Sequence, residues 1–414
     1  MPAKSFTPSP DEWIKLYTLS LFSNAVANRQ GTEAALQQCM EDILPSEIEN
    51  LDNSWALSWG PRVYKKNKLD IHNGPDNVWY AAVNESEKVV VVAVAGTSTK
   101  SLQGWVIIDF NVAQTVDFEE WTGTWTSDEI PKPTHSRPEA EPAARAAMGT
   151  CVGVWNVVSH TSSATAPGTT IGQYLETMKD YTVIFTGHSM GGAVAPLTAL
   201  ALRQSQIVPT NSTWYILPSA GATPGNQELI DMMTAQFPPG PLPSPPTKQY
   251  AVFNRDLYNT LDVVPQAWSL DPSSDRNVNK INQIYAGIGE LAAGDVKRLV
   301  NDLAVLSRVS GIKYVPIAGV PFTQDPFDAG SIETLDDVAR QAVTEHVKAY
   351  LDYFGNTDAI TRFSDRLRAH PGVKGAVLQM ASSAQAGEMS DGKVKLGQEA
   401  AVHSHSIGIG SNVI

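Results

Sequence analysis

The central part of the chain holds apolar runs that do not alternate with polar residues. The clearest is Val89–Val94, where six apolar residues follow one another. Such runs are typical of strands buried on both faces, as in a parallel sheet covered by helices. We predict strands at 78–83, 88–95, 181–186, 213–218 and 249–254.

Stretches with helical spacing alternate with these strands, notably at 191–204 and 331–354. Strands and helices in alternation predict an α/β fold with a mostly parallel central sheet flanked by helices. Residues 271–330 carry apolar positions at helical spacing, and we expect a helical insertion there. Two further interruptions are predicted as loops: 118–138, which holds two tryptophans, and 238–246, which has six prolines.

The N-terminal residues show a helix start. Ser9 suits the capping position, Pro10 the first helical position, and Glu12 completes a capping box. We predict an amphipathic helix over 10–29, ended by Gly31. The apolar stretch inside it only loosely resembles a signal peptide, because acidic residues stand where basic ones belong.

These patterns divide the chain into three parts: an N-terminal helical segment (1–60), an α/β core (61–355, with the insertion at about 271–330) and a C-terminal tail (356–414). The residues after His370 are rich in Gly, Ser and Ala and give no assignable element. No export signal is evident in the chain as given, and the compartment stays open between the cytoplasm and secretion with the signal absent. The oligomeric state stays open.

Composition narrows the function classes. The chain has 414 residues, of which 42% are hydrophobic, and its formal net charge is −13. A surface so acidic repels phosphate backbones, so we expect no nucleic-acid partner. No apolar run reaches the length of a membrane span. The two cysteines, Cys39 and Cys151, lack metal-ligand spacing, and we expect no metal and no cofactor.

The strongest chemical signal is Gly187-His-Ser189-Met-Gly191, which directly follows an apolar strand and directly precedes a helix rich in small residues. This strand–turn–helix is the nucleophile-elbow pattern of α/β-hydrolases. The glycines are needed where a β-carbon would meet neighbouring backbone. A tight glycine turn with a buried serine is the alternative interpretation.

A serine nucleophile needs a base and an orienting carboxylate, which α/β-hydrolases supply later in the chain. His346 is one candidate base, although it lies on an apolar helical stripe where a core histidine is also common. Asp262, just before an apolar pair and a proline, is favoured as the carboxylate. The remaining candidates are His370, His403 and His405 for the base and Asp256 for the carboxylate.

Four blocks resemble the class 3 lipases, the family of the filamentous-fungal triacylglycerol lipases. They are 91–109 (a strand ending in Gly96-Thr97, then Trp and Asp), 187–193, 220–226, and the pair formed by 259–265 and 346–351. The resemblance covers about 80–355 and implies the α/β-hydrolase fold. Ala95 departs from it, because the family usually has Arg there.

The resemblance implies Ser189, Asp262 and His346 as the catalytic triad. It implies an oxyanion hole formed by the backbone N–H groups of Met190 and Thr97, with the Thr97 hydroxyl as a further donor. An ordinary strand-end turn residue is the alternative for Thr97. The family carries a lid, and residues 101–110 or 118–138 could serve, with transient contact to a lipid interface.

The expected activity is therefore hydrolysis of acylglycerols or other long-chain acyl esters through an acyl-enzyme. A phospholipase A or a short-chain or feruloyl esterase could use the same triad. A serine peptidase or acyltransferase could as well, because fold alone does not fix chemistry. A catalytically inactive lipase-like binding or regulatory protein is the alternative from a different class.

Overall fold

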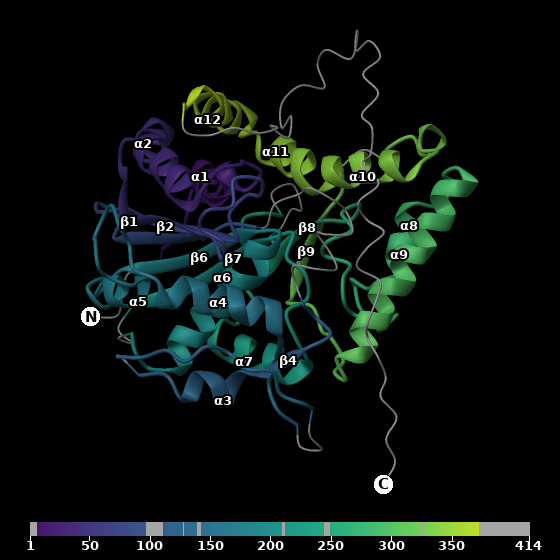
Figure 1. The fold of residues 1–414 in the computed structure, drawn as a ribbon, viewed down its shortest axis with the longest axis horizontal. Coiled ribbons are helices and arrows are strands. Elements are labelled where there is room, and N and C mark those ends of the chain that lie inside the picture. Colours follow the sequence, from purple (N-terminus) through teal and green to yellow (C-terminus); the bar gives the residue numbers. More distant parts are fainter. Residues whose placement is uncertain are drawn as a thin grey trace. The chain divides into compact units, whose positions relative to one another are not determined.

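A seven-stranded sheet runs through the centre of the molecule (Figure 1). Its order is β1-β2-β3-β6-β7-β8-β9, with antiparallel pairing at β1–β2 and β2–β3 and parallel pairing from β3 onward. The strands are β1 (Trp55–Tyr64), β2 (Asn77–Asn84), β3 (Val89–Val94), β6 (Thr182–His188), β7 (Thr213–Ser219), β8 (Asp256–Asn259) and β9 (Gly319–Phe322). A separate antiparallel pair joins β4 (Thr115–Asp117) to β5 (Arg145–Ala147).

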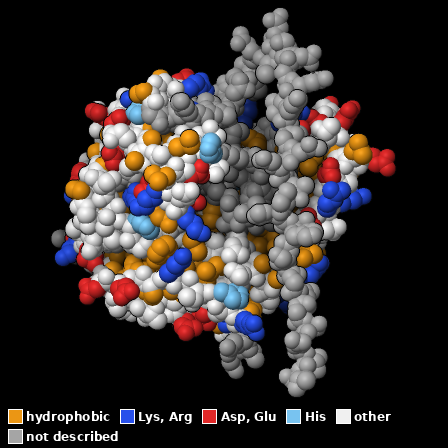
Figure 2. All heavy atoms as spheres, viewed as in Figure 1, with side chains coloured by type: hydrophobic (Ala, Val, Ile, Leu, Met, Phe, Trp, Pro, Cys, Tyr) orange, Lys and Arg blue, Asp and Glu red, His pale blue; other side chains and the backbone are white. Residues whose placement is uncertain are grey.

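The computed structural model describes residues 6–96, 111–126, 128–138, 142–208, 212–243, 249–324 and 326–371. All of them fall within one compact unit, Met1–Met380. None of the helices in these ranges has the length and apolarity that a membrane crossing requires. Acidic and basic side chains are interspersed over the face seen in Figure 2.

Strand β3 is buried on both faces, as its sequence predicts. Val90, Val92 and Val94 belong to one apolar core, and the alternate residues Val89, Val91 and Ala93 belong to the other. One core is covered by α1 (Pro10–Phe22), α2 (Glu33–Leu51), α11 (Ala349–Phe354) and α12 (Thr357–Ala369). The other is covered chiefly by α3 (Phe118–Gly123), α4 (Met148–Ser159), α5 (Ile171–Glu176), α6 (Met190–Gln204) and α7 (Gln227–Gln236) (Figure 1).

The N-terminal helix begins as predicted and ends early. Ser9 and Glu12 form the capping box, but the α-helix stops at Phe22 and a 3₁₀ turn, η1 (Ser23–Val26), follows. Residues 1–60 also contain the start of β1. The polar loop predicted at 118–138 begins with α3, and its tryptophans are buried, Trp121 against Trp125 edge-to-face at 5.0 Å.

The strand predicted at 249–254 is wrong: the strand of this region is β8, at Asp256–Asn259. Asn254 has a positive φ of 61°, which an extended strand does not allow. Its side-chain oxygen instead accepts from the backbone N–H of Ile216 at 3.0 Å. The apolar pattern did not reveal this hydrogen bond, which joins residues 38 positions apart.

The region 271–330 is helical only in part. It contains α8 (Asn279–Ile284) and α9 (Glu290–Val309), as expected, but it also supplies β9, which extends the main sheet beside β8. The helix predicted at 331–354 is divided into α10 (Leu335–Val343), a π-helical turn (Thr344–Lys348) and α11. The division of the chain into segment, core and tail stays a prediction.

Residues 357–369 of the predicted tail form α12, which packs on the N-terminal helices. Phe363 lies edge-to-face on Phe22, with ring centroids 4.9 Å apart. The carboxylate of Glu47 is fully buried and accepts hydrogen bonds from Arg362, at 3.0 Å, and from Arg366. These contacts join the two ends of the described chain.

We expect Glu47→Ala to destabilise the protein by about 2–4 kcal/mol, because it removes a buried carboxylate that holds two arginines. Urea unfolding followed by tryptophan fluorescence measures the change. Arg298→Ala is the matched control, since Arg298 forms an exposed ion pair with Asp295. Equal midpoints for the two variants would show that the α2–α12 ion pairs contribute no more than a surface pair.

Candidate active site

Ser189 stands on a sharp turn between β6 and α6. Its φ and ψ are 63° and −128°, a conformation that residues with a side chain rarely adopt. A β-carbon on Gly187 would lie 2.2 Å from the carbonyl oxygen of Gly191, and one on Gly191 would lie 2.1 Å from that of Val94. Both positions therefore require glycine, as the sequence predicted. The turn leaves Ser189 partly exposed at the first turn of α6.

Asp262 and His346 form a buried pair. His346 Nδ1 lies 2.8 Å from Asp262 Oδ2, and the two side chains are 1% and 0% exposed. The other carboxylate oxygen of Asp262 accepts from the backbone N–H of Val264 at 2.9 Å. The structure thus brings together two residues that lie 84 positions apart in the sequence.

Tyr350 binds the same carboxylate from the helix that follows His346. Its hydroxyl donates to Asp262 Oδ2 at 3.0 Å and accepts from the backbone N–H of Asn259 at 2.9 Å. Burial, followed by the charge of Asp262, holds the pKa of Tyr350 well above its usual value. The hydroxyl therefore keeps its proton and remains a donor to the carboxylate.

His346 lies in the π-helical turn Thr344–Lys348, and such turns are frequent at functional sites. The neighbouring Glu345 fixes this turn to the end of β8. Asn259 Nδ2 donates to its carboxylate at 2.7 Å and to its backbone carbonyl at 3.2 Å. Burial raises the pKa of Glu345, while the hydrogen bonds from Asn259 and Gln341 act in the opposite direction.

His188, next to the serine, supports the backbone of His346. Its Nε2 lies 2.8 Å from the carbonyl oxygen of His346, and its Nδ1 lies 3.1 Å from the Ser219 hydroxyl. Burial, together with the nearby His346, lowers the pKa of His188 well below its usual value. The ring is therefore neutral, with Nε2 donating to the carbonyl and Nδ1 accepting from Ser219.

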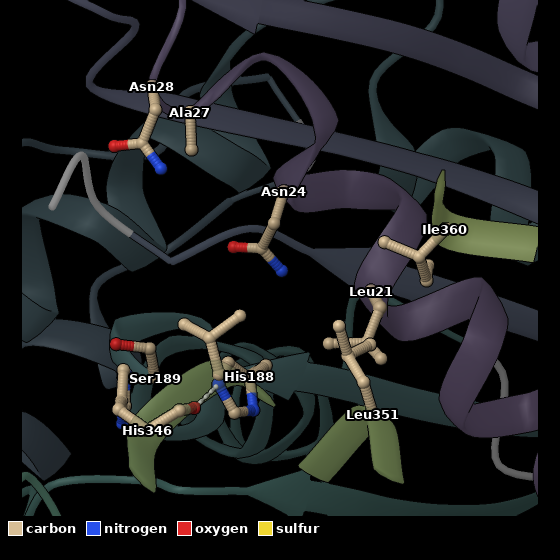
Figure 3. Close-up of a pocket in the computed structure, with 10 residues that line it drawn as sticks. Leu21, Asn24, Ala27, Asn28, His188, Ser189, His346, Leu351 and Ile360 are labelled. Carbon is tan, nitrogen blue, oxygen red and sulfur yellow. Dashed lines mark hydrogen bonds between the residues drawn. The ribbon is translucent and has the colours of Figure 1, made fainter. Parts of the chain in front are cut away.

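Ser189 and His346 line one pocket, and Figure 3 shows them side by side on its wall. The opposite wall comes from the N-terminal segment and from α12. The lining residues in these two elements are Leu21, Asn24, Ala27, Asn28 and Ile360. Sequence analysis did not find them, because they lie outside the blocks that resemble the lipases and carry no motif of their own.

The predicted oxyanion residue Thr97 lies outside the described residues, as does the lid candidate 101–110. The residue before Thr97 is described. A β-carbon on Gly96 would lie 2.9 Å from Cβ of Ser189 and 2.8 Å from the carbonyl oxygen of His188. The end of β3 therefore packs directly against the serine. Met190 begins α6 and is 7% exposed.

The alternative candidates for the base and the carboxylate lie away from the pocket, bind other residues or lie outside the described residues. His370 Nε2 is 3.0 Å from Asp42 Oδ2, at the end of α12, and His403 and His405 lie outside the described residues. Asp256 forms a buried ion pair with Arg276. Within the described ranges, no group of three or more histidine, cysteine, aspartate or glutamate side chains is arranged to hold a metal ion.

Comparison with known proteins gives one family match, over the middle of the chain. The model of the family described as lipase (class 3) matches residues 128–270, which include Ser189 and Asp262. This part of the chain is similar to the class 3 lipase family. The similarity supports a lipase-type carboxylic ester hydrolase of the α/β-hydrolase superfamily. Comparison with curated protein sequences gave no match.

Among solved structures, the M37 lipase is 20% identical to this chain, with a TM-score of 0.59, and the alignment covers 88% of this chain and 99% of that one. This similarity confirms the predicted fold. The Rhizomucor miehei lipase propeptide complex is 16% identical (TM-score 0.37; 64% and 68% covered). The Rhizopus microsporus var. chinensis lipase is 15% identical (TM-score 0.36; 64% and 74% covered).

The strained backbone of Ser189 predicts that Ser189→Gly is more stable than Ser189→Ala, by about 0.5–2 kcal/mol. Glycine adopts this φ and ψ without strain, whereas alanine keeps the β-carbon. The gain is reduced by the greater freedom of glycine in the unfolded chain. Both variants lack the hydroxyl, so thermal unfolding compares the backbone effect alone. An alanine variant as stable as the glycine variant would contradict a strained turn.

Proposed function

We propose that this protein hydrolyses acyl esters through a catalytic triad of Ser189, His346 and Asp262. The observation that carries the proposal is the buried His346–Asp262 pair, whose histidine lines the same pocket as a serine held on a strained strand–helix turn. A nucleophile beside a base that a third group orients is the arrangement of covalent acyl transfer.

In the proposed reaction, His346 Nδ1 keeps its proton and donates it in a hydrogen bond to Asp262, which leaves Nε2 to remove the proton of Ser189. The serine oxygen then forms a bond to the ester carbonyl carbon. As the intermediate collapses, the carbon–alkoxide bond breaks and His346 returns the proton to the leaving alcohol. Water, activated by His346 in the same way, releases the acid and restores the serine.

The negative charge of the tetrahedral intermediate develops at the first turn of α6. The backbone N–H of Met190 and the positive end of this helix suit that charge. Thr97 is proposed as the second donor, on the strength of the family resemblance and of the position of Gly96 against the serine. Oxyanion donors of this kind contribute roughly 10²–10³ in rate each.

The pocket supports an acyl substrate. Beside the polar groups, its lining is aliphatic: Leu21, Ala27, Val347, Leu351 and Ile360. We infer that the acyl chain lies against this wall, with long-chain acyl esters and acylglycerols as the first choice. A phospholipid, short-chain or feruloyl ester is the alternative, and an inactive lipase-like binding protein is the alternative outside catalysis.

Two segments, residues 101–110 and 118–138, are candidates for the lid. Trp121 and Trp125 are 7% and 6% exposed and pack in the apolar core, which favours a structural role over a lid for residues 118–138. Residues 101–110 stay the proposed lid, through which the protein would contact a lipid interface transiently.

Hydrolysis of p-nitrophenyl butyrate and palmitate tests the triad. We expect Ser189→Ala and His346→Ala each to lower kcat by roughly 10⁴-fold or more, since triad members act as a unit. Ser205→Ala and His370→Ala are matched controls, because neither residue lies at the site, and should keep wild-type rates. A wild-type protein inert toward both esters and toward phospholipid would favour the binding-protein alternative. If Ser189→Ala lowers kcat and His346→Ala does not, another residue is the base.

Ile360→Ala tests the acyl wall. Removing three carbons from the wall makes room for one or two further CH₂ groups of the long acyl chain, and each buried CH₂ contributes roughly 0.8 kcal/mol. We therefore expect the ratio of kcat/KM for the palmitate ester to that for the butyrate ester to rise by about three- to tenfold. The ratio is independent of how much protein is folded. Ile230→Ala removes a similarly buried side chain outside the pocket and should leave the ratio unchanged. An equal ratio in both variants would contradict this placement of the acyl chain.

A further inference from the structure

Asn24 brings the N-terminal segment into the site. It lies in η1, the 3₁₀ turn after α1, and its side chain lines the pocket with Ser189 and His346. The turn is well anchored, because the Ala27 N–H donates to the Asn24 carbonyl at 3.0 Å and Arg29 donates to the Ser364 carbonyl of α12 at 3.0 Å. The position of Asn24 is therefore set by the fold.

One end of the Asn24 amide holds the backbone beside the nucleophile. Its Oδ1 accepts a hydrogen bond from the backbone N–H of Gly96 at 2.7 Å. Gly96 follows β3 and packs so closely on Ser189 that a β-carbon at Gly96 would lie 2.9 Å from Cβ of the serine. Asn24 thus fixes the strand end that leads into the predicted oxyanion residue, Thr97.

The other end of the amide is a donor aimed into the pocket. Asn24 Nδ2 is buried, and it has no hydrogen-bond partner among the described residues. The amide cannot be turned over, because Oδ1 is required by the Gly96 N–H. Figure 3 shows this nitrogen directed toward the middle of the labelled side chains. A buried donor left unpaired is unfavourable, and an oxygen of a bound ligand would satisfy it.

We propose that Asn24 is a substrate-binding residue, whose Oδ1 positions the Gly96 backbone while Nδ2 donates a hydrogen bond to an oxygen of the bound acyl ester. The inference rests on the proposed ester hydrolysis and extends the site to an N-terminal turn that the class 3 lipase match, at 128–270, does not include. An ester supplies acceptor oxygens only, which suits a pocket whose free group is a donor.

Two substitutions separate the two ends of the amide. Asn24→Asp has the same shape and keeps the oxygen that accepts from Gly96, but it loses the donor. Asn24→Ala loses both. We expect each to lower kcat/KM for p-nitrophenyl butyrate, by at least tenfold for Asn24→Asp and by about a hundredfold for Asn24→Ala. Ala25→Asp places the same charge on the adjacent residue, outside the pocket lining, and should keep wild-type activity.

Measuring ester binding in a variant that cannot react tests the Asn24 Nδ2 donor separately from catalysis. In the Ser189→Ala background, which cannot form the acyl-enzyme, adding Asn24→Asp, which keeps the oxygen that accepts from Gly96, should raise the Kd for p-nitrophenyl butyrate about tenfold. A merely structural role for Asn24 would leave this Kd unchanged. Thermal unfolding confirms that each variant is folded.

The outcomes distinguish this inference from the proposed function. Wild-type hydrolysis that depends on Ser189, with Asn24→Asp within twofold of wild type, would overturn the donor role and leave the hydrolase standing. An unchanged Kd on adding Asn24→Asp would overturn it as well. An inert wild type would overturn the hydrolase proposal, and the Kd comparison would still decide whether Asn24 binds the ester.

Discussion

Close backbone packing at the carboxyl ends of three neighbouring strands is the constraint on which the site depends. The ends of β3, β6 and β7 meet the first turn of α6 with no room for β-carbons. A β-carbon on Gly192 would lie 2.7 Å from the carbonyl oxygen of Ser219, and one on Gly221 would lie 2.9 Å from that of Gly192. This packing forces Ser189 into its unusual backbone conformation and leaves its side chain partly exposed. The apolar burial of β3 and α6 stabilises the strained turn.

Burying Asp262 adds a second constraint, because a desolvated carboxylate must be hydrogen-bonded. His346, Tyr350 and the backbone of Val264 supply the donors. Two of these donors come from the π-helical turn and the helix after it, so the same contacts satisfy the carboxylate and orient the histidine. The neutral His188 then holds the carbonyl of His346 from the other side.

The sequence predicted the parts of this arrangement that carry a strong local signal. Unbroken apolar runs predict buried strands such as β3. The glycines around Ser189 indicate a turn that no other residue type allows. The π-helical turn at His346 left no such signal, because a π-helical and an α-helical turn present nearly the same apolar pattern over five residues. The short strand β8 was misplaced because a side-chain hydrogen bond of Asn254, rather than hydropathy, sets where the chain bends.

The pocket wall was missed for a different physical reason. Leu21, Asn24 and Ile360 are ordinary helix and turn residues, and their role arises only because the N-terminal segment and α12 pack on the same face of the sheet. That packing is fixed by long-range contacts, such as Glu47 with Arg362, between residues more than three hundred positions apart. Val347 and Leu351 line the pocket from the same block as His346, whereas Leu21, Ala27 and Ile360 come from segments outside the blocks that resemble the lipases. In the proposed hydrolase, the reacting groups therefore lie in the family-like blocks, and the wall proposed to contact the acyl chain is built partly by segments outside them.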